Sequence, residues 1–337
     1  MSHEPAAGEG EKPPAVERAS DDWQARARAS RAEFREQISA TKTDLLRQAR
    51  ARRDRIEAQS AELEAKAGRN LVFAIGLGVV LGGSVLASLL FIKALFVIVA
   101  MALAVVGTLE LTTAFRVGSR RVPRIPAAIA AAVLPPLAYF AGVDGLWLGV
   151  VCGVVFVWLC QALLPVLPGR SSVRLQDLTA AAFVLGYVGV LASFAALLLA
   201  QRNGQWWVLS FIIVTVVIDT GAYAAGATLG KHAMAPRISP NKSWEGFAGA
   251  AAAGQIAGIL LAVLLLDQPW YVGVLLGAVV LLTGTVGDLG ESLIKRDLGI
   301  KDMSTWLPGH GGFLDRIDSI LPSAAGALVL YVAVVGL

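Results

Sequence analysis

The chain has 337 residues, of which 56% are apolar and 16% are charged, and its mean hydropathy is +0.65. Soluble globular domains are closer to half apolar and a quarter charged, so this composition excludes an ordinary soluble enzyme and predicts a membrane protein. The formal net charge of +4 is small and forms no dense basic patch, which argues against a nucleic-acid partner.

The first 69 residues form a polar extension that differs from the rest of the chain. They hold 14 of the 29 Lys and Arg residues and 13 of the 25 Asp and Glu residues. We expect no cleavable secretory signal, because these residues contain no apolar h-region. Residues 1–17 are rich in Pro, Gly, Ala and Glu, which predicts disorder. Residues 20–66 lack Gly and Pro, which predicts a solvated cytoplasmic helix, with a partner-binding coiled coil as the alternative.

From residue 70 onward the chain is a series of apolar runs close to the ~20 residues that cross a bilayer as a helix. We therefore predict an all-α, polytopic membrane domain over residues 70–337 with about nine transmembrane helices. The predicted crossings are 71–92, 94–115, 125–143, 145–167, 178–200, 206–225, 246–266, 270–287 and 317–337. The third contains Pro135 and Pro136 and the sixth contains Asp219, so either could be broken or lined by protein.

The placement of positive charge predicts an orientation for these crossings. With a cytoplasmic N-terminus, 27 of the 29 Lys and Arg residues face the cytoplasm, and only Lys93 and Arg202 face outward. Because Lys and Arg concentrate on the cytoplasmic side, we expect a multi-pass plasma-membrane protein with its N-terminus inside. Two long polar loops, 226–245 and 288–316, then also face the cytoplasm.

Two acidic residues fall within predicted crossings, where ionisable groups are costly and are functional candidates by default. Asp219 leads directly into the first polar loop, which favours a functional role. For Glu110, a structural hydrogen bond to a neighbouring helix is an equal alternative to catalysis. In the first loop, Lys231, Arg237 and Lys242 indicate a polyanion site, although an ordinary positive-inside loop explains the charge equally well.

The residues around the first loop also have structural interpretations. Ser243 directly precedes an apolar run and fits the N-cap of the seventh crossing. His232 is expected to be structural.

The second polar loop has a more specific pattern. Asp315 and Asp318 are spaced i,i+3 and would share one face of a helix that begins there. Carboxylates of this kind suit Mg²⁺, which binds through one or two carboxylates together with substrate phosphates. Gly311 and Gly312 would let backbone N–H groups approach a phosphate closely. Carboxylates beside the cations of this loop are the arrangement that phosphoryl or nucleotidyl transfer needs.

The stretch 292–318 resembles the signature of the phosphatidate cytidylyltransferases, also called CDP-diacylglycerol synthases. The matching positions are Ser292, Lys295, Arg296, Lys301, Asp302, Pro308, His310, Gly311, Gly312, Asp315, Arg316 and Asp318. Segments 239–246 and 219–223 also resemble the family, so the likeness is close over 205–337, the expected catalytic region. Two departures lie outside the signature: Gly290 stands where members often carry an aromatic residue, and the N-terminal extension is an addition.

The resemblance implies transfer of CMP from CTP to phosphatidic acid, which gives CDP-diacylglycerol and pyrophosphate in phospholipid biosynthesis. It implies a requirement for Mg²⁺, with a second cation such as K⁺ as an option, and a homodimer in the membrane. The implied metal ligands are Asp288 and Asp315, with Asp318, Asp219 and Glu291 as further ligands or as residues that orient them. The implied catalytic residues are Lys242, Lys295, Arg296, Lys301, Asp302, His310 and Arg316. The implied substrate-binding residues are Ser239, Asn241, Lys242, Ser292, Lys295, Arg296, Gly311, Gly312 and Arg316.

A phosphate monoester has a second pKa of about 6, so the attacking group is largely a dianion at neutral pH and needs no strong general base. We therefore expect His310 to donate a hydrogen bond or to organise its loop. Two alternatives stay open at this point. One is another CTP-dependent transferase that acts on a different lipid-linked acceptor. The other is a secondary transporter, which would require an inverted repeat with polar segments in both halves.

Overall fold

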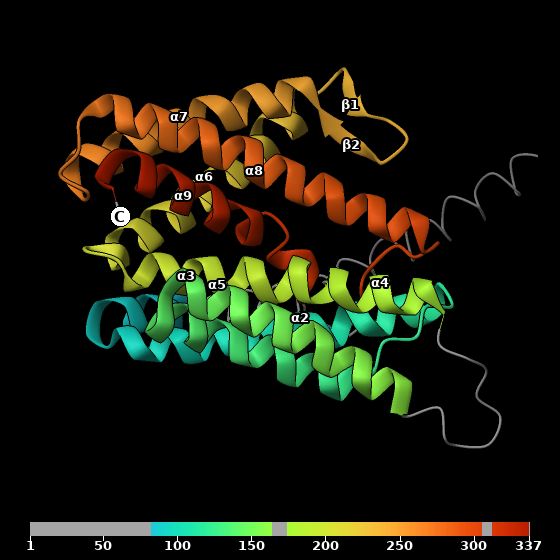
Figure 1. Cartoon of the computed structure of the whole chain (residues 1–337). Helices are drawn as coiled ribbons and strands as arrows, with labels where there is room; N and C mark the ends of the chain where they lie inside the picture. The colour runs from blue at the N-terminus through green and yellow to red at the C-terminus, as the bar shows by residue number, and fades with distance from the viewer. Residues whose placement is uncertain (1–81, 164–173, 305–311, 337) are drawn as a thin grey trace, which may run out of the picture. The chain divides into compact units, whose positions relative to one another are not determined.

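The computed structural model describes residues 82–163, 174–304 and 312–336 of the chain. They belong to the unit Val72–Leu337, and the predicted N-terminal extension lies outside the described residues. After a short apolar helix, Gly82–Phe91, the elements follow in the order shown in Figure 1. They are α2 (Lys93–Val117), α3 (Arg124–Leu163), α4 (Leu175–Val184), η2 (Leu185–Val190), α5 (Leu191–Ala200), α6 (Gly204–Leu229), β1 (Ala233–Ala235), β2 (Ser239–Ser243), α7 (Trp244–Leu264), α8 (Trp270–Asp297), η3 (Leu314–Arg316) and α9 (Ile320–Val335).

The membrane domain is built from helices, as the apolar runs predict. Six described helices are long and apolar enough to cross a membrane. Their bounds are Lys93–Val117, Arg124–Leu163, Leu175–Ala200, Gly204–Leu229, Trp244–Leu264 and Trp270–Asp297. The last helix, Ile320–Val335, is apolar but shorter, and the first predicted crossing begins outside the described residues. The count of nine crossings therefore stays a prediction.

The 40-residue helix α3 contains the third and fourth predicted crossings as two arms. Its backbone leaves the helical region at Gly142, where φ is 67° and ψ is −152°, a conformation that glycine adopts without steric cost. The two arms then lie antiparallel, because a Cβ on Gly149 would be 2.6 Å from Leu137 and one on Gly153 would be 3.4 Å from Ala130. Pro135 and Pro136 lie inside the helical span, so the chain breaks at the glycine and not at the prolines.

A small antiparallel sheet is the one described departure from an all-α fold. Strands β1 and β2 pair with Ala233 opposite Ser243 and Ala235 opposite Ser239. They form a hairpin at the end of α6, within the segment that we predicted only as a polar loop (Figure 1). The hairpin leads directly into α7, whose first turn is capped by the Ser243 side chain, which accepts a hydrogen bond from Gly246 N at 3.1 Å. The predicted N-cap is thus confirmed.

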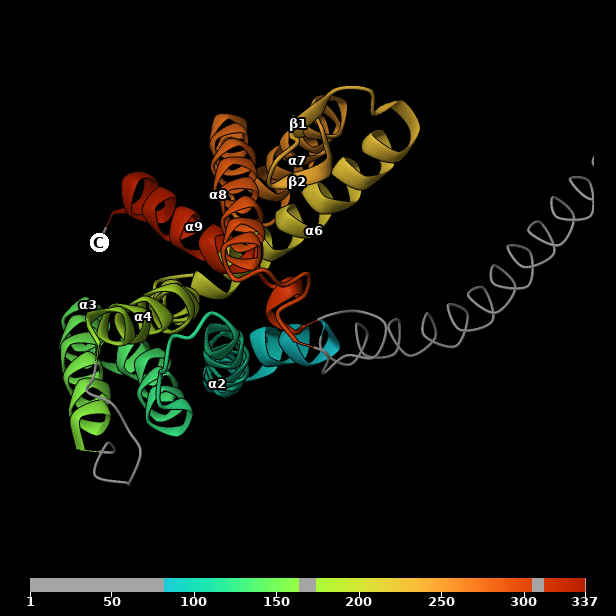
Figure 2. The same cartoon turned by 90° about the vertical axis from the view of Figure 1, so that its right-hand side faces the viewer.

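Close backbone contacts hold α6, α7 and α8 side by side, as Figure 2 shows. A Cβ on Gly273 of α8 would lie 2.4 Å from the carbonyl oxygen of Gly258 on α7, and one on Gly249 of α7 would lie 2.9 Å from the carbonyl oxygen of Gly221 on α6. Small residues at such positions let membrane helices pack backbone to backbone. This packing sets the spacing between α6, which carries Asp219 in an unbroken helix, and α8, which carries Asp288.

The segment that follows α3 is one apolar span with a local irregularity. Helices α4 and α5 are joined by η2, a six-residue π-helical turn, so the span Leu175–Ala200 is continuous. Short π-helical segments inside α-helices occur often at functional sites. Gly189 in this turn approaches α3 so closely that a Cβ would lie 2.8 Å from Leu134.

The glycine contacts predict a stability difference between two alanine substitutions on α8. Gly273→Ala forces a Cβ against the α7 backbone, whereas a Cβ on Gly290 would meet nothing within 4 Å. Overpacking of this kind costs about 1–3 kcal/mol, but Gly→Ala in an open helical position gains up to ~1 kcal/mol. We expect Gly273→Ala to lower the thermal midpoint measured by tryptophan fluorescence, and Gly290→Ala to leave it unchanged or raise it. Equal midpoints for both variants would contradict the packing described here.

Candidate active site

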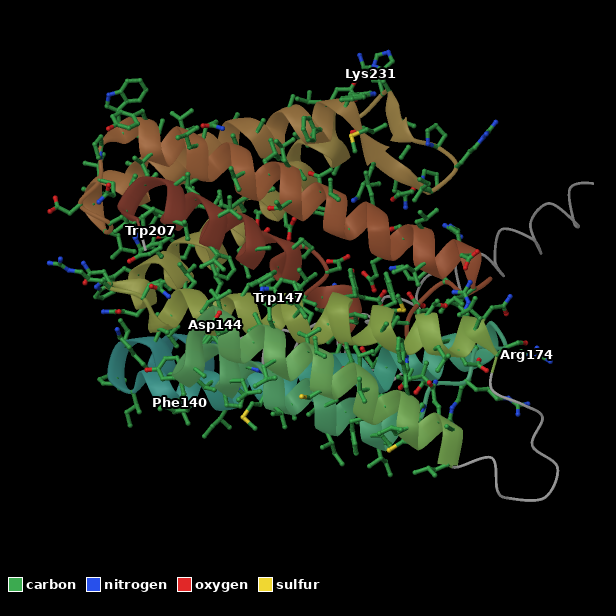
Figure 3. All side chains as sticks on the ribbon, in the orientation of Figure 1. Phe140, Asp144, Trp147, Arg174, Trp207 and Lys231 are labelled. Carbon is green, nitrogen blue, oxygen red and sulfur yellow. The ribbon has the colours of Figure 1, made fainter. Side chains whose placement is uncertain are left out.

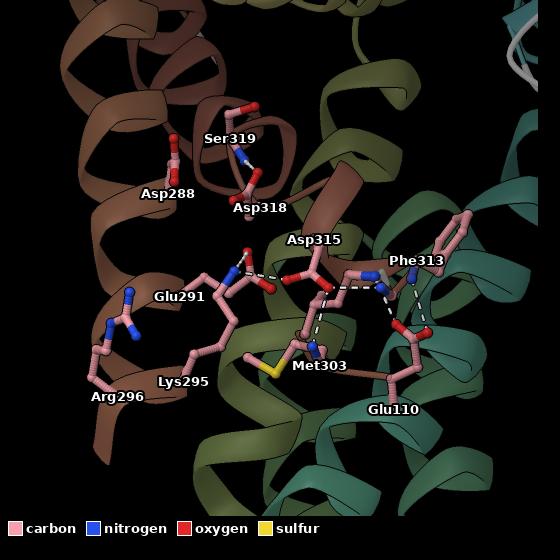
Figure 4. A network of polar contacts seen from close by, with 12 residues as sticks. Glu110, Asp288, Glu291, Lys295, Arg296, Met303, Phe313, Asp315, Asp318 and Ser319 are labelled. Atoms are coloured by element: carbon pink, nitrogen blue, oxygen red, sulfur yellow. Dashed lines mark hydrogen bonds and ion pairs between the residues drawn. The ribbon is translucent and has the colours of Figure 1, made fainter. Parts of the chain in front are cut away.

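The second polar loop is anchored to the helical domain by one buried carboxylate. Glu110 on α2 has no exposed surface. Its carboxylate accepts hydrogen bonds from Ser304 Oγ at 2.5 Å, from Phe313 N at 2.8 Å and from Leu314 N at 2.7 Å (Figure 4). Of the two roles considered for Glu110, the structure favours the hydrogen-bonding one. Its partners, however, are residues 304, 313 and 314 of the second loop and not residues of a neighbouring helix.

Asp315 organises the same loop from its inner side. Its Oδ1 accepts a hydrogen bond from Lys295 Nζ at 2.7 Å, and its Oδ2 accepts from Gly312 N at 2.7 Å and Met303 N at 3.1 Å. Burial acts to raise the pKa of Asp315, but the hydrogen bonds from Lys295 and Gly312 outweigh it and hold this pKa below its ordinary value. The carboxylate is therefore charged at neutral pH.

A second buried carboxylate, Glu291, lies on α8 one turn before Lys295 (Figure 4). It has no exposed surface, and neither of its oxygens accepts a hydrogen bond within the described part of the chain. Lys295 Nζ approaches one oxygen at 3.7 Å. Asp318 lies nearby (Figure 4). Carboxylates outnumber lysines here, and a buried charge without a full set of partners is costly.

Asp318 and Asp219 are joined by a serine that the sequence did not single out. Ser319 N donates to Asp318 Oδ1 at 2.7 Å, and Ser319 Oγ donates to Asp219 Oδ2 at 3.0 Å. A Cβ on Gly287 would lie 2.3 Å from the Asp318 carbonyl oxygen, so α8 packs directly against this segment. This contact brings Asp219 from α6 and Asp318 from the segment between η3 and α9 to the same part of α8.

The β1–β2 hairpin is attached to α8 through two predicted site residues. Lys242 Nζ on β2 forms an ion pair with Asp288 Oδ2. Arg296 Nε donates to the carbonyl oxygen of Ile238 at 3.3 Å. The structure thus attaches the first polar loop to α8. The prediction of a loop from residue 288 was wrong over 288–297, because α8 continues to Asp297. In the same hairpin region, His232 Nδ1 lies 2.5 Å from Glu245 Oε1, which agrees with a structural role for this histidine.

The remaining predicted residues lie around this network or outside it. Ser239 and Asn241 are on β2, and Ser292 directly follows Glu291 on α8. Lys301, Asp302 and Arg316 are exposed, and Gly312 is buried. Pro308, His310 and Gly311 lie outside the described residues, so their predicted roles stay predictions.

The donor chemistry of the site fits a divalent cation, although the ligand set is not assembled. Within residues 82–163, 174–304 and 312–336, no group of three or more His, Cys, Asp or Glu side chains is placed to hold a metal ion. The two predicted principal ligands each face a lysine: Asp288 pairs with Lys242, and Asp315 with Lys295. Glu291, buried without a hydrogen bond, and the adjacent Asp318 supply hard oxygen donors of the kind that Mg²⁺ binds.

Because Glu110 anchors the second loop, we expect its replacement by the nearly isosteric glutamine to destabilise the protein strongly. In Glu110→Gln an amide replaces the charged acceptor, and its NH₂ group would face backbone N–H donors. We expect a loss of about 2–4 kcal/mol, seen as a thermal midpoint lower by roughly 5–10 °C in detergent. Asp144→Asn is a matched control, since Asp144 is exposed, and should leave the midpoint unchanged. A stable Glu110→Gln protein would show that the loop has another anchor.

Comparisons with known proteins agree on one family. The sequence model of the Cytidylyltransferase family matches residues 73–334. A phosphatidate cytidylyltransferase from Mycobacterium bovis is 38% identical over 280 residues, which are 81% of this chain and 92% of that relative. Its counterpart from Mycobacterium leprae is 39% identical over 80% of this chain and 90% of its own length. One from Staphylococcus aureus is 40% identical over 42% of this chain and 55% of its own length. This chain therefore belongs to the cytidylyltransferase family.

Proposed function

We propose that this protein transfers CMP from CTP to phosphatidic acid and so forms CDP-diacylglycerol and pyrophosphate. The observation that carries the proposal is the pairing of lysines with carboxylates on α8, where Lys242 meets Asp288 and Lys295 meets Asp315. A nucleotidyl transferase needs cations for the phosphates and carboxylates for a metal in one place. Family membership and the name shared by the matched relatives support the same reaction.

The reaction joins two anions, so its barrier is largely electrostatic. An oxygen of the phosphatidate phosphate attacks the α-phosphorus of CTP, the bond from that phosphorus to the bridging oxygen of the β-phosphate breaks, and pyrophosphate leaves. The phosphate monoester is largely a dianion at neutral pH, given its second pKa of about 6, so no residue has to act as a strong base. Lys242 and Lys295 neutralise the approaching phosphates and stabilise the departing pyrophosphate.

Mg²⁺, with K⁺ as a possible second cation, belongs to the same proposal. Asp288 and Asp315 would hold the metal, with Asp318, Glu291 and Asp219 as further ligands or orienting groups. When bound, the metal supplies charge neutralisation at the transferred phosphate and at the leaving group. The surplus of carboxylates around Glu291, which is buried without a hydrogen bond, supports a cation at this place.

We also propose the orientation and assembly that the sequence predicts: nine crossings, a cytoplasmic N-terminus and active site, the plasma membrane as location, and a homodimer. Figure 3 supports a common face for the cations, because Arg174 and Lys231 lie toward the right-hand end of the domain, whereas Phe140 and Trp207 lie toward the left. CTP then reaches the hairpin and the second loop from the cytosol. The diacylglycerol part of the other substrate stays in the cytoplasmic leaflet.

The proposed reaction is tested directly by product analysis with two acceptors. Purified protein in detergent, given CTP and Mg²⁺, should convert phosphatidic acid to CDP-diacylglycerol and should leave a polyprenol acceptor unchanged. Reaction with the polyprenol alone would identify a different lipid-linked transferase and would contradict the proposal.

The ion pair between Lys242 and Asp288 predicts which carboxylate on α8 is needed for turnover. Asp288→Asn removes one proposed metal ligand and the partner of Lys242, so we expect the rate of CDP-diacylglycerol formation to fall roughly 100-fold or more. Asp267→Asn makes the same chemical change in the exposed turn before the other end of α8 and should keep the wild-type rate. Thermal midpoints of both variants show whether they are folded. A folded Asp288→Asn enzyme with the wild-type rate would show that Asp288 is not a ligand.

A further inference from the structure

Tyr187 has no role in the proposed reaction and carries a buried hydroxyl. Its Oη has no hydrogen-bond partner within the described residues. A buried polar group left unsatisfied costs about 1–3 kcal/mol, and such groups in native structures usually have a functional or solvent partner. Tyr187 lies in the π-helical turn η2, a kind of irregularity that is common at functional sites.

The surroundings of Tyr187 place it at the candidate active site. Its ring packs against the apolar cluster that contains Leu314 and Ile317, the residues that flank Asp315 and Asp318 in the sequence. In the same turn, Val188 contacts α2 at Gly107, where an added Cβ would also lie 3.5 Å from Leu314. The turn and Leu314 of the second loop therefore meet at the same position of α2.

The hydroxyl of Tyr187 lies within electrostatic range of three carboxylates of the site, which belong to Glu291, Asp318 and Asp288. Figure 4 shows these three side chains gathered beside Lys295 and Asp315. Two buried groups without hydrogen-bond partners, the Tyr187 hydroxyl and the Glu291 carboxylate, thus belong to one neighbourhood.

The other side of the Tyr187 ring leads to the apolar surface of the domain. Phe183 stacks on Tyr187 with ring centroids 5.5 Å apart and an angle of 8° between the planes. Phe183 is 42% exposed and belongs to the apolar span Leu175–Ala200. The aromatic pair therefore extends from the surface that lipid would cover inward to the buried Tyr187 hydroxyl. A nucleotide enters from water, but a lipid substrate has to approach along a path of this kind.

We propose that the Tyr187 hydroxyl donates a hydrogen bond to the phosphate headgroup of phosphatidic acid, and that Phe183 and Tyr187 line the path by which this lipid reaches the site. The proposal rests on the function proposed above. Tyr187 is thus a determinant of lipid binding and is not needed for binding CTP.

The test uses Tyr187→Phe, which removes the hydroxyl and keeps the ring that stacks on Phe183. Initial rates are measured with phosphatidic acid varied as a mole fraction of mixed micelles, and separately with CTP varied. Hydrogen bonds to charged groups are worth more than those between neutral groups, so we expect the KM for phosphatidic acid to rise at least about fivefold. The KM for CTP should stay within about twofold of wild type. The thermal midpoint should be unchanged or higher, because an unpartnered hydroxyl is removed.

Tyr331→Phe is the matched control. The Tyr331 hydroxyl donates to the Arg202 carbonyl oxygen at 3.1 Å, and its ring contacts Trp207 away from the carboxylates. This variant should lose thermal stability and keep both KM values, the reverse of Tyr187→Phe. Phe183→Leu is a second arm and should raise the KM for phosphatidic acid while leaving that for CTP unchanged.

An unchanged KM for phosphatidic acid in both Tyr187→Phe and Phe183→Leu would overturn the assignment. A rise in the KM for CTP alone would also overturn it, because the hydroxyl would then serve the nucleotide. Failure of the proposed function is a separate result, in which the wild-type protein forms no CDP-diacylglycerol from these substrates.

Discussion

Burying a carboxylate at the edge of an apolar helical domain is costly unless another group compensates its charge, and the site depends on this constraint. Glu110 finds three donors on the second loop, two of them backbone N–H groups. The mostly buried Asp315 pairs with Lys295, and the more exposed Asp288 pairs with Lys242. Each of these contacts joins segments far apart in the sequence, so charge compensation also assembles the loop, the hairpin and α8 into one site. Glu291 accepts no hydrogen bond within the described residues, and a bound cation would satisfy its oxygens.

Helix packing positions the residues that form these lysine–carboxylate pairs. Glycine contacts bring α7 against both α6 and α8 and place α8 against Asp318, so Asp219, Asp288 and Asp318 come together without any single segment carrying all three. In the described structure Lys242 neutralises Asp288 and Lys295 neutralises Asp315. In the proposed reaction, substrate phosphates would bind the two lysines, and the released carboxylates would hold the metal.

Periodicity and residue type predicted the parts of the structure that depend on local sequence. The apolar runs predicted the helices, and a serine before an apolar run predicted the N-cap at Ser243. The contacts of Glu110 and Ser319 could not be predicted, because their partners lie 100 or more residues away in the sequence. The π-helical turn that contains Tyr187 could not be predicted, because its residues continue an apolar run. The segment around Pro240 predicts only a loop, although the structure has a hairpin there. The cations and carboxylates were identifiable from their pattern, but their pairing was not.

In the proposed reaction, the lysine–carboxylate site directs attack at the α-phosphorus of CTP. Parallel reactions of the purified protein with phosphatidic acid and CTP labelled at either the α- or the γ-phosphorus test it most directly. We predict that the α-label appears in the lipid and the γ-label in pyrophosphate. Transfer of the γ-label to the lipid would indicate phosphoryl transfer and would contradict the account.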